Sequence, residues 1–349
     1  MKFKCLIILL ILSLGCLQPL DNPQTLPENS IQNFKIQICL INWKENSLNK
    51  TTQELIQIAE KIQKFYKEIS YEKVNLQFEY KNAQSNSTGT TVNEMLELAY
   101  SSCNPSRDTH ALIFYPTQIN SSNEQELGFI ESTFTHRNKI SNTDIIQVPE
   151  GKLNYLTLAH ELGHGLFNFE HPVTLHCGAK VFSETNCETA DYGNPFDFMS
   201  SGTGHVNAWD KYKAGWSEIK TVTENGNYVI SALETKEEKI KGLRVPNSKH
   251  PLCLEYRKPI GLDQEIIDND KQPLPETGCL LVSLCYTENQ EYNPGHQNLL
   301  LYTDQNPEAK QENHCIKENE KFTDTDLGVS IEFDSLENNQ AQVTVEFEN

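Results

Sequence analysis

From residue 31 to about residue 220, the spacing of apolar positions alternates between two periods. Thr51 to Ile69 carries apolar residues at helical intervals, which predicts an amphipathic helix, and shorter helices are expected at Val92–Tyr100 and Leu153–Phe167. Short apolar or alternating runs between the helices predict strands: Phe34–Trp43, Val74–Tyr80, His110–Tyr115, Leu127–Phe134 and Ile145–Val148. Strands that alternate with helices indicate an α/β domain built on a mixed sheet.

The pattern changes after about residue 220, where no helical period appears. Strand-like runs there are separated by Asn, Gly, Pro and Asp: Tyr228–Leu233, Leu252–Tyr256, Gly278–Cys285, Leu299–Tyr302, Val329–Phe333 and Gln342–Phe347. We therefore expect an α/β domain over residues 31–220 and an all-β, sandwich-like domain over residues 221–349. Residues 17–30 are rich in Pro, Asn and Gln and are interpreted as a linker.

Residues 1–16 have the parts of a secretory signal peptide. Lys2 and Lys4 give a positive start, residues 5–14 form an apolar run that is short for a membrane span, and Ser13 and Gly15 suit a cut after Gly15. We therefore expect a secreted protein with no stable membrane insertion once the signal is removed. The alternative is that the segment is retained as an N-terminal anchor.

The overall charge limits the partners. The chain carries a formal net charge of -19, which repels phosphate backbones, so no nucleic-acid partner is expected. With 37% apolar and 22% charged residues, the composition is otherwise that of a soluble globular protein.

The cysteines agree with export. Eight lie outside the signal segment and its flank, and an even number in an exported chain indicates disulfide bonds. Cys279 and Cys285 lie in one predicted strand, where six residues span about 20 Å, so they do not pair with each other. Three N-glycosylation sequons in polar stretches fit an extracellular glycoprotein: Asn49, Asn86 and Asn120.

The predicted helix at residues 153–167 carries the main chemical signal. Residues 160–164 read His-Glu-Leu-Gly-His and match H-E-x-x-H. On a helix, His160 and His164 project from one face, so their imidazoles can bind one Zn²⁺ at about 2.0–2.1 Å. Glu161 lies beside them as the expected catalytic base. The surrounding segment is strongly apolar, which favours metal binding over two ordinary surface histidines, because buried ionisable groups are costly without partners.

Catalytic zinc needs a third protein ligand and one open position. His171, close after the helix, is one candidate. Glu184 or Glu188 is the other, as in thermolysin-like enzymes.

The segment from Asp191 to Met199 favours the histidine. It resembles the stretch that ends in the methionine turn of metzincins, in which a methionine lies beneath a three-histidine zinc site. Met199 is the corresponding residue, although an ordinary core methionine is the alternative interpretation.

More specifically, the chain resembles the gametolysin-like branch of the metzincins over about residues 31–349. The resemblance rests on these stretches: His160–His171, Cys177-Gly178, Cys187, Tyr192–Met199, Gly204–Ala208, Gly215-Trp216, Leu254–Arg257 and Phe322–Asp324. It implies a metzincin-like catalytic domain and a zinc endopeptidase that acts on extracellular or cell-wall protein. Three histidines and Zn²⁺ would then activate the attacking water, with Glu161 as its base.

The chain departs from the metzincin pattern H-E-x-x-H-x-x-G-x-x-H by one residue. Counted from His160, the last ligand position falls on Glu170, and Phe167 stands where glycine is expected. Counted back from His171, Asn168 takes the glycine position, and Asn is the best non-glycine residue for a left-handed turn. We therefore predict that the helix continues through Phe167, turns at Asn168 and delivers His171 as the ligand.

A disulfide is expected between the third histidine and the methionine turn. Cys177 and Cys187 are polar-loop cysteines in an exported chain, and a bridge between them would fix the path that connects two parts of one site.

Three further residues near these motifs are not assigned to the chemistry. His205 is interpreted as structural rather than substrate-binding, Tyr192 as a core residue rather than an oxyanion donor, and His176 has no assigned role. The strand Leu127–Phe134 is a candidate for holding the substrate as an added strand.

The sequence thus predicts a secreted zinc endopeptidase whose partner is a protein or peptide substrate. The alternatives are an inactive zinc-binding module for adhesion or capture, and a thermolysin-like peptidase. The intact Glu161 argues against an inactive module, because a binding protein needs no base at that position.

Overall fold

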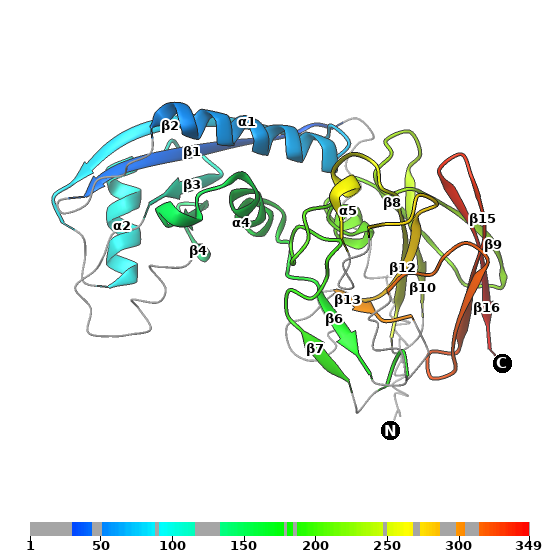
Figure 1. Cartoon of the computed structure of the whole chain (residues 1–349). Coiled ribbons are helices and arrows are strands. Elements are labelled where there is room, and N and C mark those ends of the chain that lie inside the picture. Colours follow the sequence, from blue (N-terminus) through cyan, green and yellow to red (C-terminus); the bar gives the residue numbers. More distant parts are fainter. Residues whose placement is uncertain are drawn as a thin grey trace, which may run out of the picture.

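The computed structural model describes residues 30–43, 51–87, 91–115, 133–177, 180–183, 187–246, 250–267, 273–286, 298–303 and 314–348. The predicted signal peptide, the predicted linker before residue 30 and residues 127–132 of the predicted strand Leu127–Phe134 lie outside this set. Within it, the protein is a mixed α/β fold with three sheets and few helices (Figure 1).

The first sheet has five strands in the order β2-β1-β3-β5-β4. Four of them run parallel: β1 (Gln32–Trp43), β2 (Val74–Ser85), β3 (Ala111–Phe114) and β5 (Thr143–Gln147). The strand β4 (Phe134–Ile140) pairs antiparallel with β5 and forms one edge of the sheet. Helices connect β1 to β2 and β2 to β3, as the apolar pattern predicted, whereas β5 follows β4 directly.

Two helices connect the parallel strands and cover opposite faces of this sheet. Helix α1 (Thr52–Ile69) begins with a capping box made by Thr51 and Glu54, and it packs on the face that carries Ile36 and Ile38. Helix α2 (Val92–Cys103) packs on the other face. Because β2 and β3 lie on opposite sides of β1, right-handed crossovers place the two helices on opposite faces. Helix α4 (Tyr155–Phe167) shares the face of α1.

The second sheet has seven strands in the order β7-β6-β13-β12-β11-β10-β8. Its strands come from both halves of the chain: β6 (Val173–His176), β7 (Glu188–Ala190), β8 (Glu218–Thr221), β10 (Ile240–Val245), β11 (Leu252–Arg257), β12 (Cys279–Cys285) and β13 (Asn298–Leu301). Strand β6, which follows directly after the predicted zinc ligands, pairs parallel with β13. The segment after α4 is therefore built into the same sheet as the C-terminal strands.

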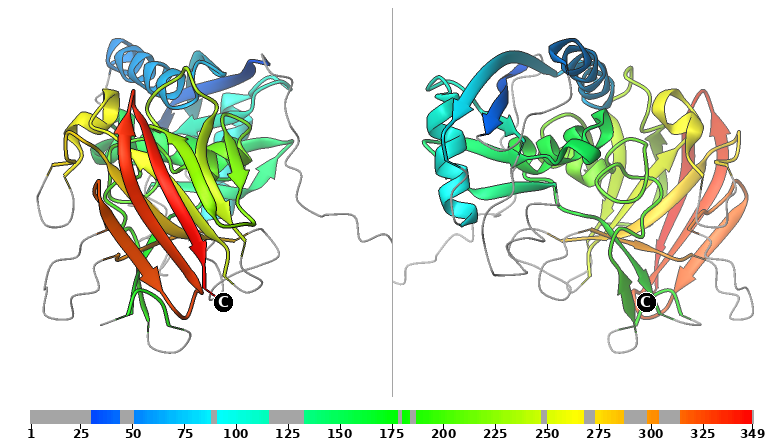
Figure 2. Two further views of the ribbon diagram at one scale, coloured as in Figure 1. Left: turned by 90° about the vertical axis from the view of Figure 1, so that its right-hand side faces the viewer. Right: turned by 60° about the vertical axis from the view of Figure 1, so that its left-hand side comes forward.

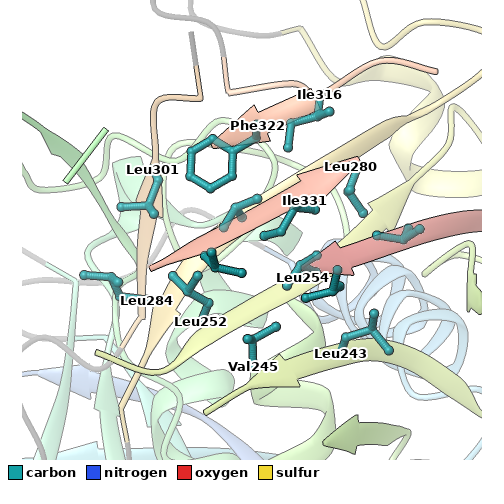
Figure 3. Close-up of a cluster of buried hydrophobic side chains, with 14 of the residues drawn as sticks. Leu243, Val245, Leu252, Leu254, Leu280, Leu284, Leu301, Ile316, Phe322 and Ile331 are labelled. Carbon is teal, nitrogen blue, oxygen red and sulfur yellow. The ribbon is translucent and has the colours of Figure 1, made fainter. Parts of the chain in front are cut away.

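The third sheet covers the second one. It has four strands, β9 (Gly226–Ser231), β14 (Glu320–Asp324), β15 (Val329–Glu337) and β16 (Gln340–Phe347), and forms an outer face of the molecule (Figure 2). Between the two sheets lies a continuous apolar core, in which Leu252 and Leu254 of β11 lie close to Phe322 and Ile331 of the outer sheet (Figure 3). These two sheets pack face to face, but the second sheet also takes up β6, β7 and β8, which lie before residue 221 and which the sequence assigned to the first domain.

Four disulfides join the described cysteines: Cys39–Cys103, Cys177–Cys187, Cys253–Cys285 and Cys279–Cys315. The pairing of Cys177 with Cys187 is confirmed, and so is the exclusion of a Cys279–Cys285 pair.

The other face of the seven-stranded sheet holds the loop of residues 194–207 through a buried ion cluster. Arg257 of β11 is fully buried, and its guanidinium donates to Glu255 at 2.9 Å and to Asp263 at 2.8 Å. It also donates to the backbone oxygens of Phe196, at 3.2 Å, and His205, at 3.1 Å. The fixed fork of the arginine therefore ties the loop to the sheet at two points.

We predict that Arg257→Met lowers the free energy of unfolding by about 3–5 kcal/mol, because it leaves two buried carboxylates and two carbonyls without their donor. Urea unfolding is the measurement. Lys321→Met is the control: this lysine forms an exposed ion pair with Glu346, which water and salt screen, so its loss should change the free energy of unfolding far less. Equal effects of the two substitutions would contradict the assigned role of Arg257.

Candidate metal centre

Helix α4 ends at Phe167, the residue predicted from the sequence. Asn154 caps its first turn by accepting from the N–H of Thr157 at 3.0 Å, and the helix runs to Phe167. Asn168 follows in the left-handed conformation, with φ of 54°, and the N–H of Phe169 donates back to the carbonyl of Gly163 at 3.1 Å. The prediction of a helix that continues through Phe167 and turns at Asn168 is confirmed.

This exit brings three imidazoles to one point. The Nε2 atom of His171 lies 2.9 Å from that of His160 and 2.9 Å from that of His164, and the two helical Nε2 atoms are 3.1 Å apart. All three residues are partly buried, and the group can hold a metal ion. Helix α4 lies between the five-stranded sheet and the strands of the other two sheets, so the centre lies where these parts meet (Figures 1 and 2).

The tautomers of the two helical histidines suit a cation. The Nδ1–H of His160 donates to the carbonyl of Phe198 at 3.1 Å, and that of His164 donates to the carbonyl of Phe169 at 2.6 Å. In a neutral ring the proton on Nδ1 leaves Nε2 with a lone pair. Two lone pairs then face each other, which is unfavourable unless a cation lies between them. Carbonyl partners on the far nitrogen are also what metal-binding histidines usually have.

The size of the triangle is compatible with a tetrahedral metal site. Nitrogen ligands at about 2.0–2.1 Å in a tetrahedral arrangement lie about 3.3 Å from one another. The observed separations of 2.9–3.1 Å are a few tenths of an ångström shorter. Burial lowers the pKa of His160, opposed by its bond to Phe198, so the neutral form that binds metal is favoured.

Glu161 lies beside the histidines and is held by a neighbour that the sequence did not reveal. The hydroxyl of Thr135, on edge strand β4, donates to Glu161 Oε2 at 2.5 Å. Glu161 is only 7% exposed; burial raises the pKa of its carboxyl, and the bonds from Thr135 oppose that effect. One carboxylate oxygen is thus fixed by Thr135, which leaves Oε1 for other partners.

Met199 is fully buried and packs against α4 at Gly163, the residue before His164. A Cβ atom placed on Gly163 would lie 2.6 Å from the Met199 sulfur, so the close approach depends on a glycine between the two helical histidines. The turn that presents Met199 is fixed by buried Asp197, which accepts from the N–H of Met199 at 2.8 Å and from the Asn207 backbone at 2.8 Å. Burial, and then the charge of Asp210, raises the pKa of Asp197 to about 7.

Tyr192 also reaches the centre, which the sequence interpretation as a core residue did not anticipate. Its side chain is 48% exposed, and its hydroxyl lies 3.1 Å from His171 Nε2. Burial of the part that is covered, together with the charges of Glu161 and Asp191, raises the pKa of the phenol.

The other candidates lie away from the centre or outside the described residues. Glu188 is on β7, opposite His176 in the register, and does not belong to the converging group; neither does Glu170. Glu184 is not among the residues described. His205 is fully buried and accepts a hydrogen bond from Lys211 at 2.8 Å, which agrees with a structural role.

No protein-family model matches the chain, and no curated protein is recognisably similar to it. In the part of the chain that the structure describes, no helix is both long and apolar enough to cross a membrane.

We predict that Gly163→Ala destabilises the protein by about 1–3 kcal/mol, because the new methyl group overlaps the Met199 sulfur. This is opposite to the usual gain from replacing a helical glycine by alanine. Thermal unfolding measures the destabilisation. In a Met199→Ala background, Gly163→Ala should cost less stability than it does in the wild type, because the sulfur that it overlaps is gone. Gly151→Ala is the matched control, since nothing lies within 4 Å of its added Cβ. A stabilising Gly163→Ala would refute the close packing of Met199.

Proposed function

We propose that this protein is a secreted zinc endopeptidase that hydrolyses peptide bonds in extracellular or cell-wall protein. One observation carries the proposal: three histidine Nε2 atoms converge within 3.1 Å of one another, with the carboxylate of Glu161 on the same helix. Three neutral imidazoles with an open fourth position are a ligand set of catalytic zinc.

His160, His164 and His171 would hold the metal. Zinc bound there would supply a Lewis acid for the scissile carbonyl and would lower the pKa of water to about 7. Because neutral imidazoles bring no negative charge, the full double charge of the ion remains available to the substrate. Imidazole also suits copper, nickel and iron, so metal analysis belongs to the test of this proposal.

Glu161 moves the proton in the proposed reaction. Its carboxylate accepts a proton from the attacking water, whose oxygen forms a bond to the carbonyl carbon of the substrate. When the C–N bond breaks, Glu161 delivers the same proton to the leaving amine nitrogen, and the carboxylate is regenerated. Thr135 positions the base. Its hydrogen bond to Oε2 fixes the orientation of the carboxylate and therefore the position of Oε1.

Edge strand β4 is the proposed place for the substrate. It lies at the end of the five-stranded sheet, and its Thr135 reaches the catalytic base. A peptide added to this edge in extended conformation would run beside the metal centre. Main-chain pairing of this kind tolerates many side chains, which suits an endopeptidase.

The family proposal is the gametolysin-like branch of the metzincins. It is supported by the motif on α4, by a third histidine that converges after the turn at Asn168, and by the packing of Met199 against α4 at Gly163. The single-residue extension of the helix is a variation on that pattern. Export is supported by the four disulfides, which form and persist in oxidising compartments.

We predict that Glu161→Gln retains stoichiometric zinc and the wild-type melting temperature but loses about 10²–10⁴-fold in kcat on a peptide substrate, because the amide cannot accept the proton. Fluorogenic peptide cleavage and metal analysis of the same samples are the measurements. Glu170→Gln, a neighbouring acidic residue outside the histidine group, is the control and should retain activity. Wild-type turnover in Glu161→Gln would show that the mechanism is wrong.

A further inference from the structure

The structure assigns a catalytic role to Tyr192: we infer that its hydroxyl donates a hydrogen bond to the oxyanion that develops on the scissile carbonyl oxygen. The inference rests on the proposed peptidase function and deepens it by naming the group that stabilises the transition state.

The first observation is the position of the phenol. Its oxygen lies 3.1 Å from His171 Nε2, and its ring lies 4.3 Å from the ring of His171 and is stacked at 6.3 Å on that of His160. In the absence of a cation, the phenol and this nitrogen are hydrogen-bonded to each other. When the nitrogen's lone pair is engaged by a metal, the O–H needs another acceptor, and the nearest new one is the oxygen of a bound substrate.

The second observation is exposure. Almost half of the Tyr192 side chain is open to solvent, whereas the other aromatic residues of its loop, Phe196 and Phe198, are 2% and 3% exposed. An aromatic ring that packs a core would be covered. The Tyr192 ring instead combines contact with His171 and exposure to solvent, so its hydroxyl is accessible to a substrate.

The third observation is the backbone. Tyr192 has φ of 56°, in the left-handed region that a bulky non-glycine residue rarely adopts, and it lies in a tight turn in which the N–H of Gly193 donates to the carbonyl of Ala190 at 3.1 Å. Glycine or asparagine would occupy this position at lower cost. Unfavourable backbone conformations persist mainly at functional sites, where the surrounding structure maintains them.

A hairpin maintains this conformation and ties it to the third histidine. Strand β6 begins two residues after His171, and β7 ends two residues before Tyr192. The two strands pair antiparallel, with Thr174 opposite Ala190, and the Cys177–Cys187 disulfide closes the far end. His171 and Tyr192 therefore leave the same end of one cross-linked hairpin, and their distance is fixed by its register.

The hydroxyl of Thr135 does not compete for this role, because it is committed to Glu161 Oε2 at 2.5 Å. When the oxyanion forms, Glu161 holds the proton taken from the attacking water and delivers it to the leaving amine nitrogen, so it does not serve the oxyanion. Tyr192 thus supplies what the rest of the centre lacks, an O–H donor directed at the space next to the metal position.

The test compares Tyr192→Phe and Tyr192→Asn with the zinc-loaded wild type, using kcat, KM, zinc content, melting temperature and the inhibition constant of a phosphinic peptide that imitates the tetrahedral intermediate. We expect Tyr192→Phe to lose about 10²–10³-fold in kcat with little change in KM and full zinc content, as is usual when an oxyanion donor is removed. The phosphinic peptide should bind more weakly by a comparable factor. Tyr192→Asn should lose the same activity while its melting temperature is unchanged or higher, because asparagine suits the turn.

Tyr155→Phe, which removes a tyrosine hydroxyl at the start of α4, is the matched control and should leave all five quantities unchanged. If the wild type cleaves the peptide and Tyr192→Phe is equally active, the role of Tyr192 is overturned while the proposed function stands. A parallel loss of zinc or of melting temperature would assign the tyrosine a structural role and also overturn it. Absence of peptide turnover in the zinc-loaded wild type would overturn the proposed function, and this inference with it.

Discussion

The left-handed turn at Asn168 is the constraint on which the rest of the centre depends. Each additional helical residue rotates the chain by about 100°, so the exit from α4 decides where the third imidazole points. The exit is fixed by hydrogen bonds on both sides: Gly163 accepts from the N–H of Phe169, and the carbonyl of Phe169 accepts from His164 Nδ1 at 2.6 Å. Buried Phe169 then packs against Trp216, with ring centroids 5.5 Å apart, which anchors the turn.

After that turn, the C-terminal half of the chain contributes residues and support to the site. His171 leads into β6, which is paired with β13 of the seven-stranded sheet, and the hairpin returns the chain to Tyr192. The next loop carries Met199 under the helix and is held to β11 by Arg257. The sandwich is thus a platform for two sides of the centre, while the five-stranded sheet supplies the third through Thr135. The proposed catalytic activity therefore depends on the packing between all three sheets.

The sequence predicted the parts of this centre that follow local rules. The motif spacing, the Asn168 turn and the Cys177–Cys187 pair depend on neighbours within about a dozen residues, and they could be derived from helical geometry and backbone preference. Most of the longer helices and strands were also predicted, because their apolar periods extend over several turns or pleats.

What the sequence did not reveal depends on contacts between distant segments. Thr135 meets Glu161 only because β4 folds back antiparallel on β5, and no local pattern marks a threonine as the partner of a base. Tyr192 shares its loop with two other aromatic residues, Phe196 and Phe198, which are buried, and the local sequence does not mark which of the three rings is exposed. Strands as short as β6 and β7 carry too few residues to show a period, which is why their addition to the C-terminal sheet was missed.

The most direct measurement is anomalous diffraction at the zinc absorption edge from crystals of the zinc-loaded protein. The account predicts one peak bonded to the Nε2 atoms of His160, His164 and His171 at about 2.0–2.1 Å, with the carboxylate of Glu170 outside the coordination sphere. A peak bound by Glu170 in place of His171, or zinc bound elsewhere with none at the three histidines, would contradict it.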